Sequence, residues 1–97
     1  MIEQLASTDF QSLPDNAITL LRGEQRTALE VKEIRLLGQH AGRAQQPFAV
    51  VLRENGARRM LPQGMFRFEH PVHGTLDLFT VPIGPDGVGA CYEIIFN

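Results

Sequence analysis

The sequence has one cysteine, one lysine and no long apolar run, and each of these absences excludes something. Because Cys91 is alone, no intrachain disulfide can form, and nothing indicates an oxidising compartment. Its apolar neighbours predict a small buried side chain and not a nucleophile, since thiol activation needs a paired base or a helix N-terminus. No segment approaches the ~20 apolar residues that a membrane span requires, and the opening MIEQLASTDF carries no secretory signal. We therefore expect a cytoplasmic protein.

The charge balance is slightly acidic, with nine basic and eleven acidic residues and a net charge of −2. A broad nucleic-acid surface is not expected, because such a surface normally shows as a basic stripe or a high pI. Lysine occurs only at Lys32, and the other eight basic residues are arginine. This bias fits ion-paired strands or a protein interface, since arginine forms bidentate pairs, and it equally fits the base composition of a genome.

One short helix is predicted near the start of the chain. The residues Thr8-Asp9-Phe10-Gln11 fit a capping box, in which the threonine oxygen accepts a backbone N–H and the glutamine reaches back. Pro14 and Asp15-Asn16 end the segment after barely two turns. Three apolar side chains of this region are expected to plug one end of the domain that follows: Leu5, Phe10 and Leu13.

The rest of the chain predicts a single all-β, mainly antiparallel domain within residues 1–97, with six or seven short strands. Strands are expected from Ala17 to the turn at Gly23, over 26–37, from Pro47 to Asn55, from near Arg58, from Gly64 to Glu69, over 75–82 and over 90–96. Asn55-Gly56 is the strongest hairpin signal, because both residues tolerate positive φ, and it predicts that the strand from Arg58 pairs back. Closely spaced short strands of this kind indicate a barrel or a sandwich and not a βαβ fold.

The strand over 26–37 changes its apolar face midway. Leu29 and Val31 share one parity, whereas Ile34 and Leu36 share the other. One extra residue restores a common face, so we predict a β-bulge near Lys32-Glu33, of the kind that bends a strand around a barrel corner. The interior of such a barrel is expected to be filled by phenylalanines, namely Phe48, Phe66, Phe68, Phe79 and Phe96.

The stretch LPQGMFRFEHPVHGTLDLFTVPIG, residues 61–84, contains the best candidate for chemistry, because His70 and His73 lie three residues apart. Together with Glu69 or Asp77 these histidines could ligate zinc or another divalent ion. A partner-binding surface is a second interpretation, and a plain hairpin loop is a third.

The hairpin loop is the interpretation that the residues favour. Pro71 and Gly74 are typical of five-residue hairpin loops, and a tight loop directs successive side chains apart. No cysteine or third histidine lies nearby, since His40 belongs to a distant loop. We therefore predict no metal site and no catalytic or cofactor-binding residue in this stretch.

Other motifs also fail as sites. The glycine-rich segment 84–89 is followed by a strand and lacks the helix and lysine of a phosphate loop. Ser7 and Ser12 are far along the chain from every histidine, so no catalytic triad can be argued. Asp77 opposite Glu69 is the closest approach to a carboxylate pair, and Arg67 is a more natural partner for either. The pair Arg58-Arg59 could contact an acidic partner or form a solvated strand end.

The stretch 61–84 and the terminal YEIIFN resemble the signature of a family of short bacterial proteins of unknown function. The opening LASTDFQSL and the segment PFAVVLR are also similar, so the resemblance covers nearly the whole chain. The matching signature residues are Leu61, Pro62, Gln63, Gly64, Glu69, His70, Pro71, Gly74, Leu78, Phe79, Pro82, Gly84, Tyr92, Glu93, Phe96 and Asn97. The resemblance implies one compact β domain without known catalytic activity and, because some members are encoded near phage-tail-like fibre or collar proteins, an accessory or assembly role. His73 lies outside the pattern.

These observations predict a non-catalytic binding or structural domain whose partner is another protein or a copy of itself. The final strand, CYEIIF, has no lysine or proline to protect it, so a dimer formed through this edge strand is expected, unless the N-terminal segment covers it. A small-ligand-binding barrel and, less favoured, a metal-dependent enzyme using His70 and His73 are the alternatives. Neither nucleic acid nor membrane is an expected partner.

Overall fold

The computed structural model describes residues 5–38 and 46–97. The elements are α1 (Thr8–Gln11), the 3-10 turn η2 (Pro14–Asn16), β1 (Ala17–Arg22), β2 (Gln25–Leu36), β3 (Phe48–Asn55), β4 (Gly64–His70), β5 (Gly74–Pro85) and β6 (Gly89–Phe96). The predicted all-β fold with one short helix is confirmed.

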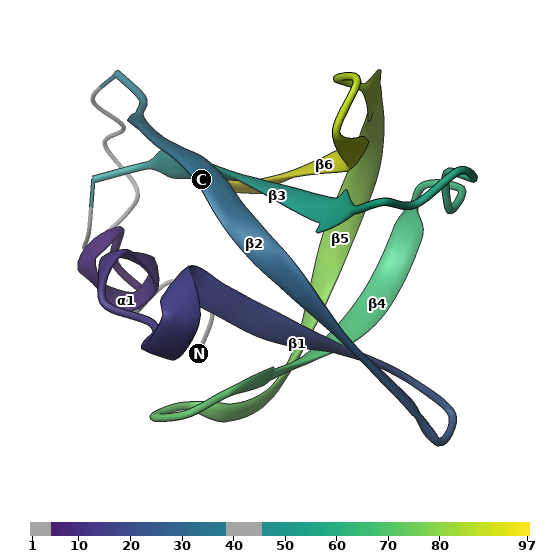
Figure 1. Ribbon diagram of the computed structural model, residues 1–97. Helices are drawn as coiled ribbons and strands as arrows, with labels where there is room; N and C mark the ends of the chain where they lie inside the picture. The colour runs from purple at the N-terminus through teal and green to yellow at the C-terminus, as the bar shows by residue number, and fades with distance from the viewer. Residues whose placement is uncertain (1–4, 39–45) are drawn as a thin grey trace.

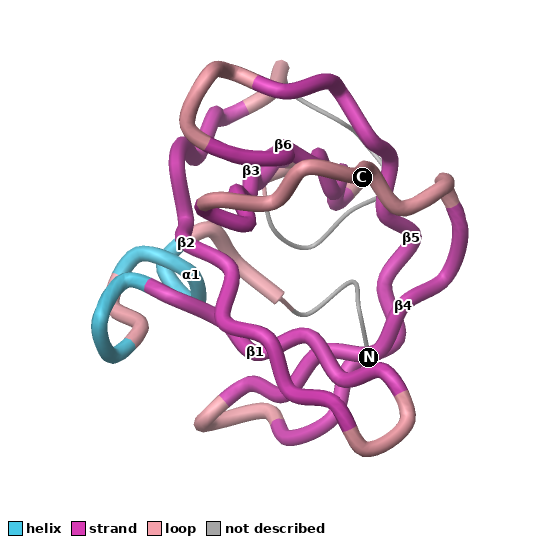
Figure 2. The backbone as a smooth tube through the Cα atoms, turned by 45° about the vertical axis from the view of Figure 1, so that its right-hand side comes forward, coloured by secondary structure: helices cyan, strands magenta, loops and turns pink. Residues whose placement is uncertain are grey.

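The six strands form a closed barrel in the order β1-β2-β3-β6-β5-β4, and every neighbouring pair is antiparallel. The ring of strands is visible in Figure 2. The barrel closes where β1 pairs with β4, for example at Leu20 opposite Phe68, and both of these side chains are buried. Because a closed barrel has no edge strand, this pairing decides between the barrel and the sandwich that the sequence left open.

The predicted bulge in β2 is confirmed. Val31 pairs with Leu52 and Glu33 pairs with the adjacent Val51, so Lys32 is the extra residue. A second register shift, between Pro82 and Gly84 of β5, was not predicted. This shift lets β5 continue to Pro85, three residues beyond its predicted end.

Period-two alternation places the core inside the barrel. Phe48, Phe68 and Phe96 are buried there and Phe66 is partly buried, as the sequence predicts. The prediction that Phe79 fills the interior is wrong, because its side chain is 49% exposed on the outer face. Its neighbours in β5 explain the error: Leu76, Leu78 and Thr80 share the inward parity, so Phe79 must point outward.

The hairpin predicted at Asn55-Gly56 is wrong. Gly56 does turn the chain, with φ of 79°, but its N–H donates to the carbonyl of Val88 and no strand returns along β3. β6 pairs with β3 instead, along its whole length from Phe48 opposite Phe96 to Asn55 opposite Gly89. The segment 57–63, which includes the predicted strand start at Arg58, connects β3 to β4 without regular structure.

The short helix α1 forms as predicted, but its cap differs. Thr8 lies inside the helix, the preceding Ser7 makes no side-chain capping bond, and Asp9 Oδ2 instead accepts the N–H of Ala6 at 2.8 Å. The predicted plug is confirmed, because Leu5, Phe10 and Leu13 all join the hydrophobic core. The helix lies at one end of the barrel (Figure 1). There the Phe10 ring packs at a tilt against those of Phe48 and Phe96, with centroid distances of 5.9 and 5.2 Å.

Candidate functional site

His70 is the last residue of β4 and is only 3% exposed. Its ring Nδ1 accepts two backbone hydrogen bonds, from the N–H of Val72 at 3.1 Å and that of His73 at 3.2 Å. These two donors require a lone pair on Nδ1, so the ring proton lies on Nε2. His70 therefore shapes the connecting loop from within. The predicted hairpin is confirmed, but His70 and Gly74 are paired strand ends, so the loop has three residues and not five.

The other face of this imidazole holds the N-terminal helix. Nε2 lies 2.7 Å from the backbone carbonyl oxygen of Asp9 and donates to it. The neighbouring Phe10 meets the His70 ring edge-on, with centroids 5.5 Å apart and an interplanar angle of 80°. His70 thus joins the β4–β5 loop to the plug by a hydrogen bond and an aromatic contact.

His73 makes a second, more exposed contact to the same helix residue. Its Nε2 lies 3.0 Å from Asp9 Oδ1, and its ring centroid is 4.9 Å from that of His70. Partial burial raises the pKa of Asp9, but the hydrogen bonds from the Ala6 N–H and from His73 outweigh it and hold that pKa below the ordinary value of 3.8. The two histidines and Asp9 therefore form a latch between loop and helix.

Within the latch, few ligand atoms are free to bind a metal ion. Both ring nitrogens of His70 are already hydrogen-bonded, and the described residues contain no group of three side chains placed to hold an ion. The carboxylates considered as further ligands are paired elsewhere, Glu69 with Arg26 and Asp77 with Arg67. His40 lies outside the described residues.

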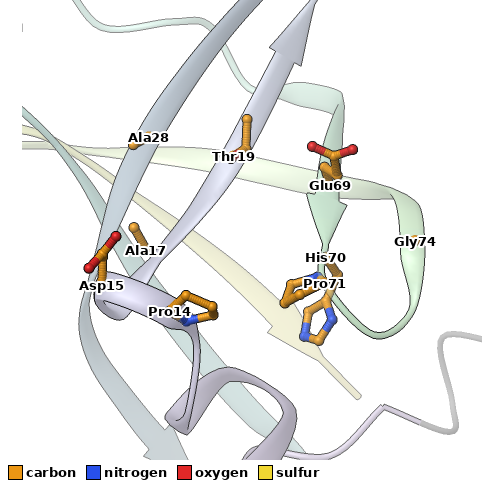
Figure 3. A pocket seen from close by; sticks show the side chains of 9 residues that line it. All are labelled: Pro14, Asp15, Ala17, Thr19, Ala28, Glu69, His70, Pro71 and Gly74. Carbon is orange, nitrogen blue, oxygen red and sulfur yellow. The ribbon is translucent and has the colours of Figure 1, made fainter.

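A surface cleft of about 590 Å³ opens beside the latch, between η2, β1, β2 and the β4–β5 hairpin (Figure 3). It is lined by Pro14, Asp15, Ala17, Thr19, Ala28, Glu69, His70, Pro71 and Gly74. Its floor is made of small side chains, and its two carboxylates belong to Asp15 and the arginine-paired Glu69. The lining contains no cysteine, serine or lysine, and its one side-chain hydroxyl belongs to Thr19.

Within the glycine-rich segment 84–89, residues 86–88 form the turn between β5 and β6, and the flanking residues belong to the two strands. Asp86 Oδ1 accepts the N–H groups of Val88 and Gly89, at 2.9 and 3.0 Å, which closes the turn. Its Oδ2 lies 2.7 Å from Arg53 and 2.9 Å from Lys32. These two cations, together with the two N–H groups, lower the pKa of Asp86 far below its usual range.

Sequence analysis did not identify Asp86 as important, although an aspartate followed by glycine in a turn is a signal for this kind of bond. Its cationic neighbours cover the thiol of Cys91, which is 3% exposed and has Lys32 Nζ 4.0 Å from Sγ. Burial raises the pKa of this thiol. Cys91 is buried, as predicted, but under charged side chains on the outer face of β6 and not in the core.

A small gap lies among the described side chains that face the interior of the barrel. It measures about 10 Å³, which is room for about one water molecule at most. It is lined by Leu20, Leu29, Leu61, Phe66, Phe68, Thr80 and Tyr92. A ligand held inside the barrel, as in larger barrels, would require these side chains to move.

Comparison with known protein families supports the resemblance noted in the sequence. The model of a family described as Domain of unknown function (DUF6916) matches residues 5–96, which include the plug helix and all six strands. The chain belongs to this family. No curated protein and no solved structure matches the chain.

The match places the latch inside the DUF6916 domain, because Asp9, His70 and His73 all fall within the matched residues. The family description assigns no activity to these positions. Among the described residues of this DUF6916 chain, none of the helices has the length and apolar character needed to cross a bilayer.

Proposed function

We propose that this DUF6916 chain is a non-catalytic binding or structural domain that associates with another protein or with copies of itself. In this proposal it works in the bacterial cytoplasm, and the family resemblance favours an accessory role beside a phage-tail-like or fibre protein. The single observation that carries the proposal is a row of exposed apolar side chains on the outer face of the barrel.

The row crosses three neighbouring strands. Met65 of β4 pairs directly with Phe79 of β5, and these side chains are 61% and 49% exposed. In the antiparallel pair of β5 and β6, Val81 lies opposite Glu93. Phe79 precedes Val81 by two residues and Ile95 follows Glu93 by two, so both side chains lie on the same side of this pair and on the outer face. Ile95 is 51% exposed. Methionine and aromatic side chains are enriched in protein interfaces, and adjacent exposed apolar side chains mark such surfaces.

This outer face, defined by Met65, Phe79 and Ile95, replaces the edge strand as the expected route to association. The edge-strand hypothesis needs unpaired backbone groups on β6, but β6 pairs with β3 on one side and, from Ala90 to Glu93, with β5 on the other. Contact through side chains needs no free edge. Self-association therefore stays a prediction, with a different surface as its physical basis.

Sedimentation velocity at tens of micromolar tests self-association. We expect the wild type to sediment as a dimer or larger species, and the double variant Met65→Ser/Phe79→Ser to sediment as a monomer. Val72→Ser is the control, because Val72 is apolar and 79% exposed but lies in the β4–β5 loop. A wild type that stays monomeric, or a control that dissociates as readily, would contradict self-association through this face.

The alternatives have separate tests. A thermal-shift screen in which a small ligand stabilises the protein would favour a binding barrel, although the interior gap of about 10 Å³ gives this function no support. Elemental analysis of protein purified without a histidine tag would favour a metal-dependent enzyme if it found stoichiometric metal.

A further inference from the structure

The described arginines fall into two groups. Four are ion-paired on the barrel surface, as Arg26 with Glu69, Arg35 with Glu93, Arg53 with Glu30 and Asp86, and Arg67 with Asp77. The other three, Arg22, Arg58 and Arg59, form no ion pair or hydrogen bond with any side chain in the part of the chain that the structure describes. All three are exposed.

The three unpaired guanidinium groups belong to residues that line one hollow on the surface. Arg22, at the end of β1, and Arg58 and Arg59, in the segment after β3, line the same surface hollow of about 550 Å³. The remaining lining residues are Glu54, Ala57, Met60 and Leu61. We call this the arginine hollow. It contains three cationic side chains and one carboxylate on a chain whose net charge is −2.

The wall that carries Arg58 and Arg59 is held in place although it has no regular structure. On one side of the pair, Gly56 N–H donates to the Val88 carbonyl at 2.9 Å. On the other side, Leu61 N–H donates at 2.9 Å to the hydroxyl of Tyr92, whose side chain is buried in the barrel. The two arginines are therefore presented from a segment anchored at both ends, which lowers the entropy lost on binding.

We infer that the arginine hollow binds an acidic segment of a partner protein, whose carboxylates pair with Arg22, Arg58 and Arg59. Guanidinium groups recognise carboxylates in a bidentate manner, and unpaired ones have no internal bond to give up. Met60 and Leu61, both partly buried, provide an apolar wall for side chains between the acids. The inference rests on the proposed function, since it names the chemistry of the protein partner, but it uses a different surface.

An extended nucleic-acid backbone fits this hollow less well than an acidic peptide does. Phosphate-binding surfaces gain affinity from many cations along a stripe, whereas here three cations gather in one place and Glu54 lies among them. The overall acidic charge also opposes a polyanion that extends beyond the hollow.

The test is an amide-correlation NMR titration of the ¹⁵N-labelled full chain with the peptide Glu-Leu-Glu-Leu-Glu. We expect shifts at Arg22 and over 54–61, at least tenfold weaker binding in Arg58→Gln/Arg59→Gln, and weaker binding at high salt. Arg35→Gln is the control, because it removes one arginine charge from an ion pair near the opposite end of β3. This control should bind within twofold of the wild type.

Three outcomes would overturn the inference. The first is no shift at millimolar peptide, or shifts located elsewhere. The second is equal binding of Gln-Leu-Gln-Leu-Gln, which would show that charge is not recognised. The third is a ten-nucleotide oligothymidylate that shifts the same residues at lower concentration, which would make the partner a nucleic acid.

The titration also separates this inference from the proposed function. Met65→Ser/Phe79→Ser should bind the peptide like the wild type, whereas Arg58→Gln/Arg59→Gln should keep the wild-type sedimentation. Loss of peptide binding in the Met65→Ser/Phe79→Ser variant would contradict the assignment of binding to the hollow.

Discussion

At the scale of single residues, Gly89 occupies a position that admits no side chain. A Cβ atom built there would lie 2.1 Å from the carbonyl oxygen of Glu54 and 2.9 Å from Cα of Asn55, both of which are backbone atoms of the paired strand β3. Backbone cannot move aside as a flexible side chain can. In the sequence this glycine is only one residue of the glycine-rich segment 84–89, because the close approach arises from the distant pairing of β6 with β3.

We predict that Gly89→Ala destabilises the protein by about 3 kcal/mol or more, because overpacking against backbone forces the strands apart. Urea unfolding monitored by circular dichroism measures the change. Gly64→Ala is the control, since a Cβ at Gly64 meets open space, and we expect it within about 0.5 kcal/mol of the wild type. Similar unfolding midpoints for the two variants would refute the close approach.

Replacing each of the two histidines should lower the free energy of unfolding by very different amounts. His70→Ala removes the partners of three backbone groups and leaves a cavity, so we expect a loss of about 3 kcal/mol. His73→Ala removes one partly exposed contact to Asp9 and should cost less than about 1 kcal/mol. The same urea experiment checks both values, and a larger loss for His73→Ala would reverse the roles assigned here.

The sequence allowed a partial prediction of these two roles. The presence of Pro71 and Gly74 correctly predicted a hairpin at this position. The burial of His70 could not be predicted, because its partner Asp9 lies 61 residues away in the chain. Only the fold brings the helix to the loop.

At the scale of elements, local patterns predicted local features well. The change of apolar parity in β2 correctly located the bulge at Lys32, because the face of a strand is fixed by its own sequence. The Asn55-Gly56 signal failed because β3 already has β2 on one side and takes β6 on the other. A turn signal reports where a chain bends, and not which strand its neighbour will pair with.

The free energy of unfolding is expected to depend on pH through Asp9 of the helix α1. The folded pKa of Asp9 is lowered, so its ionised form stabilises the folded state above the unfolded pKa, and this contribution is lost as pH falls through the folded pKa. We predict that Asp9→Asn is less stable than the wild type at neutral pH, and that the difference shrinks in the acid range below pH 3.8.

Urea unfolding at several pH values measures this difference. Glu24→Gln is the control for removing one carboxylate, because Glu24 is exposed in the turn between β1 and β2. If the difference in free energy of unfolding between the wild type and Asp9→Asn stayed constant down to the acid range, the contribution of the ionised Asp9 would be contradicted.

At the scale of the whole molecule, barrel closure organises everything else. Alternation alone predicted an all-β domain but could not choose between a barrel and a sandwich, since closure depends on β1 meeting β4 across more than forty intervening residues. Closure also places Phe79 on the outer face and leaves a gap of only about 10 Å³ beside Leu20, Leu29 and Phe68. The consequence is that binding is expected on the outside of the barrel.

The central claim is that His70 serves the fold by latching the plug helix to the closed barrel. Long-range ¹H–¹⁵N correlation NMR of the His70 ring at neutral pH, before and after an equimolar addition of Zn²⁺, tests it most directly. We predict a bare Nδ1, a protonated Nε2 and no response to zinc. A proton on Nδ1, or ring signals that shift in proportion to added zinc, would contradict the latch.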